Sequence, residues 1–224
     1  DRLGRLPGVE SVAAASLIPF AEGNWTASFF TEDQPPSPGR TLPLAAMRVV
    51  TPGYFRFLGI PLQRGRDFSP ADDAVSPRVT IVDAGTARRL WPGEDPGGKR
   101  MPFSETVKDA RWLTVVGVAG EVKDASLDAD PMIHVYLPQN QSTQRAMFLL
   151  VRGRGVTPAT SFLPAIRKEI ARMDPDQPIF AVRTLESYVS DALAQPRFRS
   201  SLIGLFALLA LVLATLGIYA VIST

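Results

Sequence analysis

An uncharged apolar segment near the end of the chain restricts the fold more than any other feature. Residues 202–222 read LIGLFALLALVLATLGIYAVI. At about 1.5 Å per residue this segment forms a helix about 32 Å long, which matches a hydrocarbon layer of about 30 Å. Thirteen of its residues are Leu, Ile, Val or Phe, and at about 0.3 to 0.6 kcal/mol each their insertion gains roughly 4 to 8 kcal/mol. The segment predicts a transmembrane helix within residues 196–224.

Small residues recur along this segment at spacings of three, four and three, namely Ala207, Ala210, Ala214 and Gly217. A stripe of small side chains lets another helix approach closely in a bilayer. We therefore expect helix packing on this stripe, and the alternative is that these residues only face lipid. A helix wholly buried in a soluble core is disfavoured, because the rest of the chain is too small to cover it on every side.

Composition excludes several kinds of partner and site. The 24 Lys and Arg nearly balance the 22 Asp and Glu. The sequence also has no run of basic residues that could bind along a phosphate backbone, so nucleic acid is not an expected partner. With no cysteine, a disulfide framework, a thiolate nucleophile and a Cys-based zinc site are excluded. The chain begins without Met or a signal sequence, so we expect it to be a piece of a longer protein.

The part before residue 139 reads as short strands joined by turns. Thr51 is a predicted N-cap with Pro52 at the first helical position, and a second helix is expected near 84–91. The expected strands are 9–16, 43–50, a β-rich stretch around PLQRGRDF (61–68), 78–82, 112–120 and 133–137.

The pattern changes after the polar stretch QNQSTQ. AMFLLVR (146–152) predicts a strand, and Thr157 with Pro158 begins a helix. PIFAVR (178–183) predicts another strand, which completes a β-α-β unit. The apolar face of the helix carries Phe162, Ile166 and Ile170, whereas Arg167, Lys168 and Arg172 point away.

An amphipathic helix is expected directly before the apolar segment. Thr184 caps TLESYVSDALAQ, and Pro196 either kinks the junction or starts the next helix. The apolar residues at helical spacing are Leu185, Tyr188, Val189, Ala192 and Leu193. We interpret this segment, together with Pro196, as a coupling helix.

GEDPGGKR (93–100) differs by one residue from the phosphate-binding loop G-x-x-x-x-G-K-[ST]. Arg100 stands where a magnesium-binding hydroxyl is required, and Pro96 removes a backbone donor from the loop. A helical pattern, not a strand, precedes the stretch. The motif therefore predicts an ordinary turn and no bound nucleotide.

No catalytic, cofactor-binding or metal-binding residue is predicted. His134 is the only histidine, and in a strand it is expected to be half-buried and structural. The aspartates of KDASLDADP lack the glycine and the closing glutamate of a calcium loop, so a solvated turn is expected; they are Asp124, Asp128 and Asp130. A G-x-S-x-G elbow is absent, which disfavours a serine hydrolase.

The order of the motifs resembles the extracytoplasmic region of MacB/FtsX-type ABC transporter permeases. TPGYFRFLGIPLQRGRDF, VTIVDAGTARRLWPGEDPGGKR, WLTVVGVAGEV, DPDQPIFAVRTLESYV and the final apolar segment carry the resemblance nearly from end to end.

The resemblance implies an α+β fold, in which a porter-like β-α-β subdomain contains an inserted β-rich subdomain and is followed by a transmembrane helix. Residues 1–58 and 143–195 would form the porter-like part and residues 59–142 the insert. The implied partners are an ABC ATPase domain or subunit, a second permease half, the lipid bilayer and other envelope proteins. No cofactor is implied, because ATP is hydrolysed outside this chain.

The implied location is the bacterial inner membrane, with residues 1–195 in the periplasm. Arg197 and Arg199 then lie on the periplasmic side, against the positive-inside rule, which long translocated domains commonly escape. The expected function is a non-enzymatic permease that couples ATPase motions to the periplasmic domain for export or mechanotransmission. The alternative is a membrane-anchored sensor or ligand-binding module, which further hydrophobic spans in the full-length protein would argue against.

Overall fold

The computed structural model describes residues 2–122 except 20, 22, 24 and 40, residues 132–190 except 156–158, and residues 203, 206, 207, 210 and 211. The chain divides into two units, Asp1–Ile179 and Phe180–Thr224. The first unit contains the sheet and the three named α-helices.

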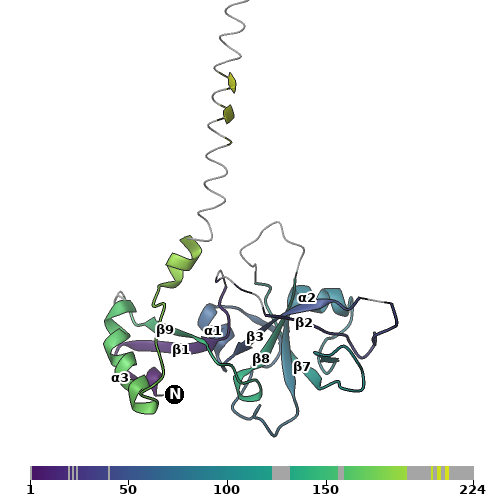
Figure 1. The fold of residues 1–224 in the computed structure, drawn as a ribbon, viewed down its shortest axis with the longest axis horizontal. Coiled ribbons are helices and arrows are strands. Elements are labelled where there is room, and N and C mark those ends of the chain that lie inside the picture. The colour runs from purple at the N-terminus through teal and green to yellow at the C-terminus, as the bar shows by residue number, and fades with distance from the viewer. Residues whose placement is uncertain are drawn as a thin grey trace, which may run out of the picture. The chain divides into compact units, whose positions relative to one another are not determined.

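A nine-stranded mixed sheet forms the centre of the first unit (Figure 1). Seven strands follow the order β4-β7-β5-β8-β3-β1-β9, while β2 pairs with β3 and β6 pairs with β7. The strands are β1 (Val9–Ala15), β2 (Thr26–Ser28), β3 (Leu44–Val50), β4 (Leu62–Gly65), β5 (Val79–Asp83), β6 (Arg100–Pro102), β7 (Trp112–Ala119), β8 (Ile133–Pro138) and β9 (Phe148–Gly153).

The two parallel pairs lie inside the sheet and consist almost wholly of buried residues. β3 runs parallel to β8 from Ala45↔Ile133 to Val50↔Pro138, and β5 runs parallel to β7. All six residues of β8 and all five of β5 are buried. Strands covered on both faces read as continuous apolar runs rather than as alternating patterns, which explains the sequences IHVYLP and VTIVD.

Short helices connect and cover the strands. The α-helices are α1 (Tyr54–Leu58), α2 (Ala84–Leu90) and α3 (Leu163–Met173), and the 3-10 helices are η1 (Leu3–Arg5), η2 (Gln139–Gln141) and η3 (Ala159–Phe162). α1 buries Tyr54, Phe55 and Phe57, and the Phe55 ring meets the Tyr136 ring edge-on at 4.9 Å between centroids. This contact fixes α1 against β8.

The α3 helix packs on β1 and β9 through the ring of Phe162 (Figure 1). A Cβ atom added to Gly153 would lie 2.5 Å from this ring, and one added to Gly8 would lie 2.8 Å from it. The ring therefore occupies space that only two glycines leave open. Ile166 and Ile170 continue the same contact, so the predicted apolar face of this helix is confirmed.

Carboxylates hold the turn that follows β4. Both oxygens of Asp72 accept from the Arg66 guanidinium, at 2.6 and 2.7 Å, and Asp72 also accepts from the Ser69 backbone N–H. The hydrogen bond from Arg66 is the main reason that the pKa of Asp72 lies below its ordinary value. Asp67 accepts from the Gly53 N–H at 3.2 Å and so ties this turn to the start of α1.

The sequence predicted seven of the nine strands at nearly these positions, and the predicted helix near 84–91 is confirmed as α2. The strands β2 and β6 were not predicted, because three-residue elements are too short to show a period. The mixed α+β class is confirmed. The described residues show no complete transmembrane helix, so that part of the predicted architecture stays a prediction.

The predicted N-cap at Thr51 is wrong. α1 begins at Tyr54 after Gly53, whose backbone lies in the left-handed region at φ 83°. The Thr51 hydroxyl instead accepts from the Ala14 N–H at 2.8 Å, and the Thr51 N–H donates to the Ala14 carbonyl. Thr51 therefore joins the ends of β1 and β3, a long-range contact that local sequence does not reveal.

The predicted strand at 178–183 is also wrong, because residues 178–184 form no strand in the structure. Ala181 has φ 53°, which interrupts an extended backbone, and Phe180 and Val182 are exposed. The β-α-β unit is therefore incomplete at its second strand. The apolar stretch PIFAVR predicted the strand, but a strand also requires a neighbouring edge.

The division into a discontinuous porter-like subdomain and an insert stays a prediction. In the sheet order, β4, β7, β5 and β8 all come from residues 59–142, whereas β3, β1 and β9 come from the flanks. The two sets of strands meet where β8 pairs with β3.

Replacing Phe162 by Ala should detach α3 from β1 and β9. The loss of a buried ring commonly costs about 3 to 5 kcal/mol, and here two glycines leave a gap that neighbouring side chains cannot fill. Urea unfolding followed by circular dichroism measures the change. Phe180→Ala is the matched control, since Phe180 is 72% exposed and a surface change costs at most about 0.5 kcal/mol. Equal effects of the two variants would contradict the packing described.

Replacing Asp72 by Asn should lower the free energy of unfolding at pH 7 by about 1 kcal/mol. The ordinary pKa of Asp is 3.8, and the folded value is lower. The ionised pair therefore contributes fully above about pH 5, and its contribution is lost as the pH falls through the folded pKa. Urea midpoints between pH 7 and pH 2.5 should converge for the two proteins at the acid end. A difference that stays constant with pH would contradict this assignment.

Candidate functional surfaces

The loop 93–99 is built as a turn rather than as a phosphate cradle. The Gly98 N–H donates to the Val115 carbonyl at 2.9 Å, and the Lys99 N–H donates to the Pro96 carbonyl. The Gly97 N–H donates to the Asp95 carboxylate. These backbone donors are engaged within the protein, so they do not converge on an anion.

Lys99 contacts two carboxylates instead of a phosphate. Its ammonium lies 2.7 Å from Glu94 and 3.1 Å from Asp33. These hydrogen bonds raise the pKa of Lys99, and the bond to Glu94 has the larger effect. Arg100 belongs to β6, donates to Glu32 and lies 4.8 Å from the centroid of the Trp112 ring. Both cations thus fasten the segment 32–34 to β6, and the predicted turn is confirmed.

A buried polar group lies where β5 passes into α2. Asp83 caps α2 by accepting from the Thr86 N–H at 2.7 Å. Burial raises the pKa of Asp83, against the hydrogen bonds from Thr86. The backbone N–H of His134 donates to the Thr86 hydroxyl at 2.9 Å, and His134 is 5% exposed. The predicted structural position of His134 in a strand is confirmed, although it is buried rather than half-buried.

The capping role of Asp83 was not predicted from the sequence. The signal was an Asp directly before the first residue of a helical pattern, which is a common N-cap. The predicted strand ended at residue 82 and the predicted helix began near residue 84, so Asp83 was assigned to neither element. Within the described residues, no group of three or more His, Asp or Glu side chains is placed to hold a metal ion.

The predicted coupling helix is described only in its first part. Residues 185–190 are helical, and Thr184 caps them by accepting from the Ser187 N–H at 3.3 Å. The Arg183 guanidinium lies 4.7 Å from the centroid of the Tyr188 ring. Leu185 is 40% exposed. The remaining predicted members of this helix, Ala192, Leu193 and Pro196, lie outside the described residues.

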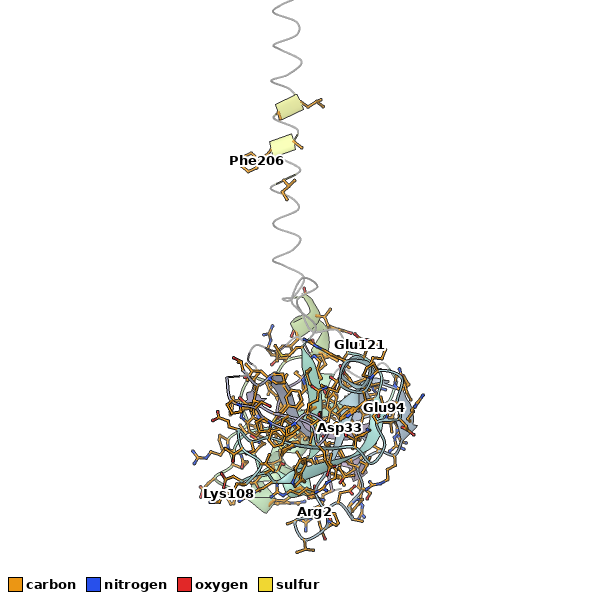
Figure 2. All side chains as sticks on the ribbon, turned by 90° about the vertical axis from the view of Figure 1, so that its right-hand side faces the viewer. Arg2, Asp33, Glu94, Lys108, Glu121 and Phe206 are labelled. Atoms are coloured by element: carbon orange, nitrogen blue, oxygen red, sulfur yellow. The ribbon has the colours of Figure 1, made fainter. Side chains whose placement is uncertain are left out.

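The predicted transmembrane segment also lies largely outside the described residues. The described positions within it are helical and exposed: Ile203, Phe206, Ala207, Ala210 and Leu211 (Phe206 is labelled in Figure 2). Ala214 and Gly217 of the small-residue stripe are not among them. In the portion that the structure describes, no helix has both the length and the apolar character needed to cross a membrane.

Comparison with solved structures identifies similar folds. The periplasmic region of MacB from Actinobacillus actinomycetemcomitans matches with a TM-score of 0.53 at 16% identity, over 77% of this chain and 71% of that chain. A domain of a protein described as a permease from Porphyromonas gingivalis matches with a TM-score of 0.51 at 19% identity, over 83% of this chain and 84% of that chain. At these identities the likeness concerns the fold alone.

No curated protein sequence matches the chain. The model of the family described as the MacB-like periplasmic core domain matches residues 2–170, which include every named strand and most of α3. The chain therefore belongs to the family of MacB-like periplasmic core domains, which are the extracytoplasmic domains of permease-type ABC transporter proteins.

Proposed function

We propose that this chain is the periplasmic part of an ABC permease subunit that couples the motions of a partner ATPase to rearrangement of the periplasmic domain. The observation that carries the proposal is the order of parts along one chain. The family match over residues 2–170 is followed by a capped helix at 185–190 and by the uncharged segment 202–222.

The order of these parts provides a path for force between the periplasmic domain and the membrane. A helix transmits displacement along its axis because each backbone N–H is bonded four residues back, whereas a flexible linker does not. In the sequence, the helix that Thr184 begins is followed by Pro196 and then by the apolar segment. The proposed partners are an ABC ATPase domain or subunit, a second permease half and the inner-membrane bilayer, with residues 1–195 in the periplasm.

Three glycines inserted between Pro196 and Arg197 should uncouple the periplasmic domain from ATP hydrolysis. The full-length subunit with its ATPase is reconstituted in proteoliposomes. This chain has no cysteine, and any cysteine elsewhere in the full-length subunit is replaced by Ser. Val75→Cys, at a position that is 92% exposed, then carries the only spin label. ATP should change the distance between labels of the two permease halves in the uninserted protein, and the insertion should abolish this change while ATP hydrolysis continues.

The same three glycines inserted after Val107, an exposed turn position, serve as the control and should leave the ATP-dependent change intact. An unchanged response in the Pro196 insertion would overturn the coupling role. Loss of the response in both insertions would show that the effect does not depend on the helix before the apolar segment.

A further inference from the structure

The positive charge of the first unit is concentrated on one part of the sheet and the helices packed on it. Residues 2–15 and 145–176, which include η1, β1, β9, η3, α3 and the turn after α3, carry eight Lys or Arg and four Asp or Glu. Residues 16–144 carry thirteen Lys or Arg and fifteen Asp or Glu. The near-neutral total therefore hides an excess of four positive charges on a set of elements that pack together.

All eight basic side chains in this set belong to exposed residues. We call the following residues the basic face: Arg2, Arg5, Arg154, Arg167, Lys168 and Arg172. Three contacts hold its elements together, since Arg2 and Arg172 pair with the same Glu169 carboxylate at 4.0 and 3.1 Å, and the Arg154 N–H donates to the Gly8 carbonyl.

Residues 2–15 and 145–173, which contain η1, β1, β9, η3 and α3, include only two acidic residues, Glu10 and Glu169, against eight Lys or Arg. Glu169 is the only acidic residue of 145–173, and Arg2 and Arg172 share it. On α3 the apolar side chains Ile166 and Ile170 face the sheet, so Arg167 and Lys168 remain on the solvent side. Folding thus brings elements that carry an excess of positive charge together, and the repulsion between like charges costs stability unless an anionic surface compensates it.

From this charge distribution we infer that the basic face binds the anionic phospholipid headgroups of the membrane to which the chain is attached. This inference rests on the proposed membrane location. Binding to anionic headgroups requires only flexible Lys or Arg side chains near the membrane surface, and each of them contributes about 1 kcal/mol of binding free energy. A protein interface would instead be built around apolar and aromatic anchors. Among the described residues of these elements, only Leu149 and Met173 are large exposed apolar side chains.

The connection between α3 and the apolar segment makes weak binding of the basic face to the membrane effective. Residues 174–201 separate α3 from the apolar segment, and at about 3.3 Å per residue they reach at most roughly 90 Å. A domain held this close to a bilayer meets its headgroups at a high effective concentration. A modest charge excess is then sufficient for binding.

The test uses the whole 224-residue chain with vesicles of phosphatidylcholine alone or with one third phosphatidylglycerol. A fluorophore is placed at Ala171→Cys, an exposed α3 position between Lys168 and Arg172, and the vesicles carry a headgroup spin label that quenches on contact. The same fluorophore at Val75→Cys reports the remainder of the unit. Flotation of the vesicles reports attachment of the chain separately from quenching.

We expect quenching at position 171 only with the anionic vesicles, and its loss on raising NaCl from 50 to 500 mM. The triple variant R167Q/K168Q/R172Q should weaken the docked state by roughly a hundredfold, because about 1 kcal/mol for each charge is about fivefold. The matched control K108Q/R111Q, which removes two exposed basic residues from residues 16–144, should leave quenching unchanged. The salt series on the unsubstituted chain keeps the test valid if the triple variant folds poorly.

Each other outcome is decisive. Flotation with equal quenching in both lipids, or without quenching, overturns the inference and leaves the membrane span intact. Absence of quenching together with tight binding of polyglutamate assigns the face to an acidic protein instead. Flotation only with anionic vesicles, lost in the triple variant, supports the inference and contradicts the predicted span. Flotation with neither lipid contradicts both.

Discussion

The parallel pairing of β3 with β8 holds the whole sheet together. It joins residues 88 positions apart in the chain, from Ala45↔Ile133 to Val50↔Pro138, and both strands are almost wholly buried. Without it the sheet would separate into β4-β7-β5-β8 and β3-β1-β9. Each half alone would expose a strand edge and much of its apolar core, which a stable sheet avoids.

Polar side chains around this sheet mainly fix the backbone where strands end. Asp83 caps α2, Thr51 joins the ends of β1 and β3, and Asp67 ties a turn to α1. The Thr80 hydroxyl donates to the Tyr136 carbonyl inside the sheet at 2.8 Å. Such bonds contribute about 1 kcal/mol each when made and cost more when a buried partner is left alone. These four polar side chains therefore serve the architecture of the first unit.

The loop 93–99 illustrates why a short motif has chemical meaning only in its context. A phosphate site requires several backbone N–H groups and a lysine directed at one point. Here the N–H of Gly98 donates to the Val115 carbonyl of β7, and the ammonium of Lys99 pairs with Glu94 and Asp33. The sequence already contained the contrary evidence, Pro96 and Arg100, because each removes a group that the phosphate loop needs.

The charge distribution depends on topology as well as on sequence. The basic residues of 145–172 can be found from the sequence alone. Arg2 and Arg5 join them only because β1 pairs with β9 and brings η1 beside α3. A count over the whole chain gives near neutrality. The fold brings these basic residues onto elements that pack together, so the average over the chain does not describe this part of the first unit.

By itself the sequence determined the features that depend on neighbours in the chain. The apolar runs of β5, β7 and β8, the helical spacing of Phe162, Ile166 and Ile170, and the cap at Thr184 were all predicted, because period and capping are local properties. The order of motifs also predicted the family.

Only the tertiary structure decided the features that depend on distant partners. It assigned Thr51 to a strand junction rather than to a helix start, left 178–183 without a strand because extended residues need a neighbouring edge, and used Gly8 and Gly153 to admit the Phe162 ring. Strand order and the joining of β3 to β8 belong to the same class. Hydrogen bonds between strands and the fit of a ring into a gap are set by residues far apart in sequence, so no local pattern encodes them.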